Sequence, residues 1–157
     1  MKRLSILFFS VVFCNIINAQ TITETVGTGT GTQAITANSF STAYAFSGTA
    51  DTRVTSISSG YAGASGGKNV FMTNSGTSTF QMANINTLGC TGASLQFGIW
   101  KSSASGTPLT AAAFIVEYSV NNGGSWTSLA WGSNNLGSAW TQSTSVSLPS
   151  EIGRAHV

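Results

Sequence analysis

The segment Ala93–Lys101 (ASLQFGIWK) decides the fold class, because its residue types alternate with a period of two. Every second position is large and apolar, namely Leu95, Phe97 and Ile99. The positions between them are Gln96, Gly98 and Trp100. An extended chain turns successive side chains to opposite faces, so this pattern predicts a strand with one face in a core.

Two later segments, Phe114–Val120 and Trp140–Leu148, alternate in the same way. We expect their core positions to be Phe114, Val116, Tyr118, Val120, Trp140, Val146 and Leu148. Outward positions are expected at Ile115, Glu117, Ser119, Thr141, Ser143, Ser145 and Ser147. Further strands are expected at Gln20–Val26, Asn69–Thr73 and Thr77–Met82, the last two paired around Asn74–Gly76.

Nothing in the sequence predicts a helix, because apolar residues show no 3.6 period and Gly, Ser, Thr and Asn interrupt every candidate. Short alternating strands with glycine-rich turns indicate an all-β protein. The expected architecture is an antiparallel β-sandwich (jelly roll).

The N-terminus has the features of a secretory signal peptide at Met1–Ala19. Lys2 and Arg3 precede the apolar run Leu4–Phe13, and the small residue Ala19 suits cleavage before Gln20. The apolar run is shorter than the roughly 20 residues that a membrane span needs. We therefore expect a secreted, extracellular or cell-surface protein with no membrane span in its mature part.

Charge is scarce in the mature segment and argues against nucleic-acid binding. Four cations balance four anions, so no basic patch can follow a phosphate backbone. Cys90 is the one cysteine after the signal peptide, which excludes an internal disulfide within this sequence. Without a partner to activate its thiol, Cys90 is best read as a small buried apolar residue.

Catalytic and metal-binding combinations are also scarce. The only histidine is His156, so neither a Ser-His-Asp nor a Cys-His arrangement is available before the tail, and zinc is not expected. Glycoside hydrolysis needs two carboxylates facing one bond, but Glu24, Asp51 and Glu117 lie in separate segments. Calcium at Asp51 with loop carbonyls is conceivable, although one carboxylate compensates little of the cation's charge. We expect no catalytic residues and no cofactor.

The last seven residues, Glu151–Val157 (EIGRAHV), break the composition by crowding charge together. They can be encoded by GAG ATC GGA AGA GCA CAC GTC, which resembles read-through into a common sequencing adapter. We therefore expect the authentic protein to be interrupted near Ser150. The expected organisation is a signal peptide at 1–19, a β-sandwich module at 20–150, incomplete at its end, and a non-native tail at 151–157.

Ser119–Trp126 (SVNNGGSW) resembles an Asp-box, Ser-x-Asp-x-Gly-x-Thr-Trp, with Asn121 in the Asp position. We expect a structural hairpin, because Asn and Gly tolerate positive φ and Trp126 can fold back over the turn. Gly63–Asn69 (GASGGKN) lacks the first glycine and the final Ser or Thr of a phosphate loop, and Gly27–Thr32 (GTGTGT) lacks the context of a dinucleotide site. Both are expected to be turns.

Trp100 is the strongest candidate for ligand binding. On the face opposite the core it accompanies Gln96, and it accompanies Glu117 if the two strands are neighbours. An aromatic ring beside carboxylate and amide groups suits sugar recognition, because the ring stacks on C–H faces and the polar groups bind hydroxyls. The alternative is that a loop covers Trp100, for example the loop that holds Trp131.

Several segments between about Thr55 and Pro149 resemble a family of secreted jelly-roll modules found in multidomain proteins of the Bacteroidota. The matching stretches are Ser59–Gly67 (SGYAGASGG), Ile85–Thr87 (INT), Leu95–Gly98 (LQFG), Val116–Ser119 (VEYS) and Trp126–Leu129 (WTSL). Such modules are similar to galactose-binding-like and carbohydrate-binding jelly rolls, and stand beside nuclease, peptidase or adhesin domains. The resemblance implies a binding module and transfers no catalytic residue.

The expected function is therefore non-catalytic binding of a glycan or other cell-surface polymer by the N-terminal module of a larger protein. Two alternatives stay open. One is a structural spacer or adhesion module without a small ligand. The other is the N-terminal fragment of a secreted hydrolase or nuclease whose catalytic domain follows the interruption.

The tail gives a direct prediction for the gene. Resequencing through the codon for Ser150 should recover a longer open reading frame with a different sequence after that codon, because the adapter-like string is not expected in the genome. Independent genomic reads that encode EIGRAHV and then a stop codon would refute this and remove the basis for a missing catalytic domain.

Overall fold

The computed structural model describes residues 21–73, 76–87, 92–101, 113–132 and 139–149. The predictions for the signal peptide, Cys90 and the tail lie outside these residues. The described elements are β1 (Gln33–Ala34), the 3-10 turn η1 (Ile35–Ala37), β2 (Ala45–Ser47), β3 (Asp51–Arg53), β4 (Asn69–Phe71), β5 (Gln81–Ala83), β6 (Ser94–Leu95), β7 (Gly98–Ile99), β8 (Val116–Tyr118), β9 (Thr127–Leu129), β10 (Thr141–Gln142) and β11 (Val146–Ser147).

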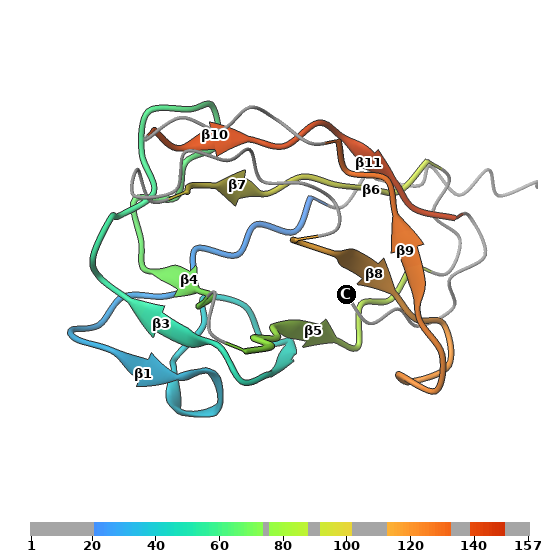
Figure 1. Ribbon diagram of the computed structural model, residues 1–157, viewed down its shortest axis with the longest axis horizontal. Coiled ribbons are helices and arrows are strands. Elements are labelled where there is room, and N and C mark those ends of the chain that lie inside the picture. Colours follow the sequence, from blue (N-terminus) through green and yellow to red (C-terminus); the bar gives the residue numbers. More distant parts are fainter. Residues whose placement is uncertain (1–20, 74–75, 88–91, 102–112, 133–138, 150–157) are drawn as a thin grey trace, which may run out of the picture.

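The protein is all-β, as predicted, and every described strand pair is antiparallel (Figure 1). One sheet has three strands in the order β1-β3-β4. The other pairs are β2-β5, β6-β11, β7-β10 and β8-β9. β6 and β7 follow one another along the chain, and β10 and β11 run beside them in the opposite direction.

The predicted opening strand is wrong for the described residues 21–26, which form no strand. Side chains take the place of strand partners here. The backbone N–H of Thr25 donates to Ser41 Oγ at 2.9 Å, and that of Val26 donates to Glu24 Oε1 at 2.6 Å. Backbone groups satisfied by side chains in this way no longer need a neighbouring strand.

The predicted hairpin between Asn69–Thr73 and Thr77–Met82 is also wrong. β4 pairs with β3, placing Thr52 opposite Val70, and β5 pairs with β2, placing Phe46 opposite Met82. Alternation identified strand-forming residues in both segments, but it carries no information about which strand lies alongside.

The strands predicted at 93–101 and 140–148 are each divided into two short strands, β6 and β7 in the first and β10 and β11 in the second. Between the short strands, Phe97 of the first segment lies beside Ser143 of the second. Phe97 N donates to Ser143 Oγ at 3.1 Å, and Ser143 N donates to Phe97 O at 2.8 Å. A side-chain oxygen thus replaces one carbonyl acceptor. This role explains why Ser143 is buried, although its place in the alternation predicted an outward position.

A hydrophobic core joins strands from the C-terminal half of the described chain. Its buried members are Ile99, Val116, Trp131 and Val146, and partly buried Leu95, Phe97, Phe114 and Leu129 pack against them. The predicted core face of 93–101 is confirmed. Val120 is 53% exposed, so its predicted place in the core is wrong.

Trp131 is the largest side chain of this core and is 1% exposed. Its indole Nε1 donates to Phe114 O at 2.8 Å, and its ring meets the Phe114 ring edge-on at a centroid distance of 5.5 Å. A buried indole needs such a hydrogen-bond partner. Trp131 therefore fills the core and does not serve as a cover for Trp100.

The Asp-box-like segment folds as a hairpin between β8 and β9, as predicted. Gly124 N donates to Asn121 O at 3.1 Å, and Asn122 and Gly123 have φ of 56° and 81°. Asn121 Oδ1 accepts from Ser125 N at 2.8 Å, and Ser119 Oγ accepts from Gly123 N at 2.9 Å. These contacts and angles describe a turn of the type that matches strand twist.

Trp131→Ala should lower the free energy of unfolding by about 3–5 kcal/mol, because it opens a cavity and leaves Phe114 O without its donor. Urea denaturation followed by circular dichroism measures the loss. The control is Trp126→Ala, since that indole is 39% exposed against the hairpin. Equal losses for the two variants would contradict this account of the core.

Candidate functional site

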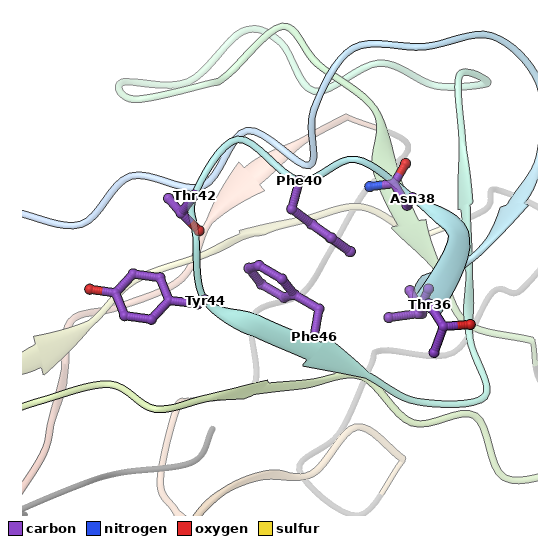
Figure 2. A pocket seen from close by; sticks show the side chains of 7 residues that line it. Thr36, Asn38, Phe40, Thr42, Tyr44 and Phe46 are labelled. Carbon is purple, nitrogen blue, oxygen red and sulfur yellow. The ribbon is translucent and has the colours of Figure 1, made fainter.

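An open hollow of about 270 Å³ lies beside η1 and β2 (Figure 2). It is lined by Ile35, Thr36, Asn38, Phe40, Thr42, Tyr44 and Phe46. From Thr36 onward the lining takes every second residue, while the residues between are small and exposed, as in Ala43 and Ala45. The segment 35–46, which begins with the 3-10 turn η1 and ends in β2, therefore supplies the whole lining of the hollow.

The aromatic part of the hollow is a stack. The rings of Phe40 and Phe46 lie 3.8 Å apart between centroids with an interplanar angle of 17°. Phe80, which precedes β5, lies 5.9 Å from each of them. Because β2 pairs with β5, Phe46 and Phe80 lie close together, and Phe80 extends the aromatic cluster beyond Phe40 and Phe46. In Figure 2 the Tyr44 ring extends beside Phe46 with its hydroxyl directed away from both phenylalanines.

The turn that carries Thr42 is held by the carboxylate of Glu24. Oε2 accepts from Thr42 N at 2.8 Å and from Thr42 Oγ1 at 2.6 Å. Oε1 accepts from Ser41 N and Ser41 Oγ, each at 2.9 Å, and from Val26 N at 2.6 Å. The Glu24 carboxylate is therefore occupied in holding the backbone together.

Burial acts to raise the pKa of Glu24, but hydrogen bonds from Thr42 and Ser41 outweigh it and hold this pKa below its ordinary value of 4.5. Donors that favour the charged form of a carboxylate have this effect. Glu24 is thus an anion at neutral pH with no proton to offer a substrate.

Asn38 forms the other polar edge and connects the hollow to buried side chains. Its Oδ1 accepts from Lys68 Nζ at 2.9 Å and from Thr52 Oγ1 at 3.1 Å, and its Nδ2 donates to Val26 O at 3.1 Å. Lys68 is 3% exposed. The burial of this lysine, and the strand rather than helix that follows it, agree with the prediction that the segment is no phosphate loop.

The chemistry of the hollow is that of a binding site. Stacked rings offer an apolar surface to the C–H face of a ligand, and a phenol with nearby hydroxyl and amide groups can bind its hydroxyls. In the part of the chain that the structure describes, no group of three or more His, Cys, Asp or Glu could hold a metal ion. The alternation of larger and small residues along 36–46 is visible in the sequence and could have indicated this site, although it matches no known motif.

The three residues predicted to bind a ligand have different surroundings. Trp100 is half-buried and its ring lies 6.5 Å from that of Trp140, tilted by 34°. Gln96 is exposed between β6 and β7. Glu117 lies in β8 and accepts from Ser128 Oγ of β9 at 3.3 Å. Glu117 was expected beside Trp100 only if their two strands were neighbours. Among the described strand pairs, β7 pairs with β10 and β8 pairs with β9, so β7 and β8 are not paired with each other. The role of Trp100 stays a prediction.

A loop covers part of the face that Trp100 shares with Gly98. A Cβ at Gly98 would overlap the Tyr61 hydroxyl, which bonds Ser58 Oγ at 2.9 Å. The indole of Trp140, predicted to be in the core, is half-buried and donates to Ser56 O at 2.9 Å. Within the described residues, the loop before β4 therefore contributes to covering this face.

Comparison with protein-family models, curated proteins and solved structures finds no significant match in any of the three. The resemblance to secreted jelly-roll modules thus gains no support from relatives. Within the described ranges, no helix is long and apolar enough to cross a membrane.

The Glu24 contacts predict a pH-dependent stability. Because the folded-state pKa is lowered, the contribution of Glu24 is fully present above its unfolded pKa and is lost as pH falls through the folded one. Glu24→Gln should cost about 1 kcal/mol at neutral pH and remove this part of the acid dependence. Urea titrations at a series of pH values test it.

Two threonine variants provide the control. Thr42→Val removes a donor to the carboxylate, so its cost should shrink as pH falls. Thr49→Val removes the hydroxyl contacts to Thr77 and Thr79, which involve no titratable group, so its cost should be the same at every pH. A pH-independent cost for Thr42→Val would contradict the assignment.

Proposed function

We propose that this protein is a non-catalytic, secreted module that binds a glycan or another cell-surface polymer. The observation that carries the proposal is the open hollow at 35–46, whose lining combines the rings of Phe40, Tyr44 and Phe46 with the polar side chains of Thr36, Asn38 and Thr42. Its size suits one sugar ring rather than a long ligand enclosed on all sides.

The surroundings of the hollow favour binding over catalysis. The nearest carboxylate contacts the turn through both oxygens, and the nearest ammonium is buried behind Asn38. Neither is arranged as an acid and base on two sides of a scissile bond. A neutral polymer rich in hydroxyl groups matches a site of this chemistry.

The same proposal includes the finer fold and location. We propose that the short antiparallel sheets belong to a jelly-roll β-sandwich exported by the signal peptide at 1–19, as the N-terminal module of a larger surface protein. The core shared by Leu95, Ile99, Val116 and Val146, from four different strands, supports a sandwich layer. The first alternative is a structural spacer that binds no ligand. The second is a fragment of an enzyme whose catalytic domain follows Ser150, and sequencing of the gene tests it.

Tyr44 gives the sharpest test. Tyr44→Ala should weaken glycan binding about five- to thirtyfold, because loss of ring stacking costs on the order of 1–2 kcal/mol. The secreted protein is screened on a broad glycan array, and the best ligand is then titrated by calorimetry. Tyr44→Phe separates the contribution of the hydroxyl from that of the ring.

Two variants complete the design. Trp100→Ala tests the site predicted from sequence, and Trp126→Ala serves as an exposed indole remote from both candidates. If Trp100→Ala alone abolishes binding, the glycan function holds and the hollow does not carry it. Absence of binding to every glycan on the array would refute the function and favour the spacer.

A further inference from the structure

A buried lysine in the described part of this fold contacts carboxamide oxygens rather than a carboxylate. Lys68 lies directly before β4 and is 3% exposed. Its Nζ contacts Gln33 Oε1, and it lies 2.9 Å from Asn38 Oδ1. The ion pair found within the described part of the chain joins Arg53 to Asp51, and no carboxylate there meets Lys68.

Among the described residues, the hydrogen-bond acceptors of this buried ammonium group are two neutral carboxamide oxygens. Transfer of an ammonium from water to the interior costs several kcal/mol unless an anion and good hydrogen bonds offset it. A reaction that removes the charge would relieve that cost. The reactive partner is in contact, because the Asn38 carboxamide carbon is one bond beyond the oxygen that Nζ touches.

We propose that Lys68 and Asn38 condense into an intramolecular amide cross-link after the chain has folded. Lys68 Nζ attacks Asn38 Cγ, a C–N bond forms, and the bond from Cγ to Nδ2 breaks. The ammonium form of lysine and the carboxamide give a secondary amide and an ammonium ion, so atoms and charge balance without any co-reactant. The positive charge leaves the interior with the departing nitrogen.

Neighbouring groups suit each stage of this reaction. The Thr52 hydroxyl donates to Asn38 Oδ1 at 3.1 Å, where negative charge develops during attack. Thr52 is itself fully buried, which strengthens that hydrogen bond. Gln33 Oε1 contacts Nζ from a second direction and positions it. Rotation of the last lysine torsions must bring Nζ from the edge of the carboxamide to the face of Cγ.

The site also lies where a covalent tie would be effective. Asn38 is the residue at which η1 ends, and Lys68 precedes β4 in the three-stranded sheet, 30 residues along the chain. Small extracellular domains commonly rely on staples, and the mature segment has a single cysteine. The cross-link would change Asn38 at the edge of the hollow, but it leaves the Phe40–Phe46 stack and Tyr44 unaltered, so its test does not depend on glycan binding.

The test is the intact mass of the purified protein. The wild type should weigh about 17 Da less than its sequence, the mass of one ammonia. The fraction with the lower mass should grow with time after refolding, because the bond forms only once the fold has brought the two side chains together. Wild-type protein whose mass stays at the sequence value after prolonged incubation would overturn the proposal.

Cyclisation of an N-terminal Gln20 also releases ammonia, so the position of the loss must be established. After trypsin digestion the cross-linked protein should yield the segment that ends at Arg53 joined to an uncut segment 54–101, because an acylated lysine is not cleaved. Separate peptides cut after Lys68 would refute the cross-link even if the intact mass were lower.

Two variants complete the test. Lys68→Arg should keep the uncross-linked mass apart from any Gln20 cyclisation. Asn38→Asp should lose water, about 18 Da, and so reach the same final mass as the wild type. Failure of either variant to fold leaves the wild-type peptide map as the deciding measurement.

Discussion

The structure depends on short polar side chains that take over backbone hydrogen bonds. Its described strands are two or three residues long, so the ladders between them are brief. Every buried N–H and C=O beyond a ladder still needs a partner. Glu24 supplies acceptors to three backbone N–H groups, and Ser143, Asn121 and Ser119 do the same elsewhere. A composition rich in Ser, Thr and Asn and poor in charge is what such a fold requires.

This constraint separates two parts that are stabilised in different ways. Around Trp131, apolar side chains from 95–99, 114–116 and 146 exclude water in the ordinary manner. Around Lys68, the interior is polar, with Thr52, Asn38 and Gln33 bonded to one another. The hollow lies at the edge of the polar part. Its aromatic stack is therefore backed by hydrogen-bonded groups that fix orientation, which a binding surface needs.

The sequence was informative wherever a local pattern determines a local structure. The core face of 95–99 and the hairpin at Ser119–Trp126 follow from alternation and from residues that accept positive φ. The partners of β4 and β5 could not be predicted, because register and neighbours depend on contacts that are distant in sequence. The opening strand failed because a glutamate two residues from Val26 satisfies its N–H, an arrangement that alternation does not detect.

The candidate site shows the same division. The alternation at 36–46 was visible in the sequence, but its meaning depended on Phe80 and on Glu24, which come from other segments. Trp100 was predicted to bind a ligand because a tryptophan on an outward face suits sugar stacking. In the structure, residues 56–61 cover part of that face. Sequence identifies aromatic residues that are available for binding, and only the tertiary packing decides which of them are covered.

Asn38 is where the two proposals meet, and the chemistry keeps them separable. The cross-link would retain its carbonyl oxygen and replace its NH₂ group by a single amide N–H, so one of its two N–H donors would be lost and one would remain for Val26 O. Thr52 would keep its acceptor, and the edge of the hollow would lose one donor. Binding that relies on the Phe40–Phe46 stack and Tyr44 does not require that donor. The cross-link would therefore stiffen the polar part of the fold without deciding whether the hollow binds a ligand.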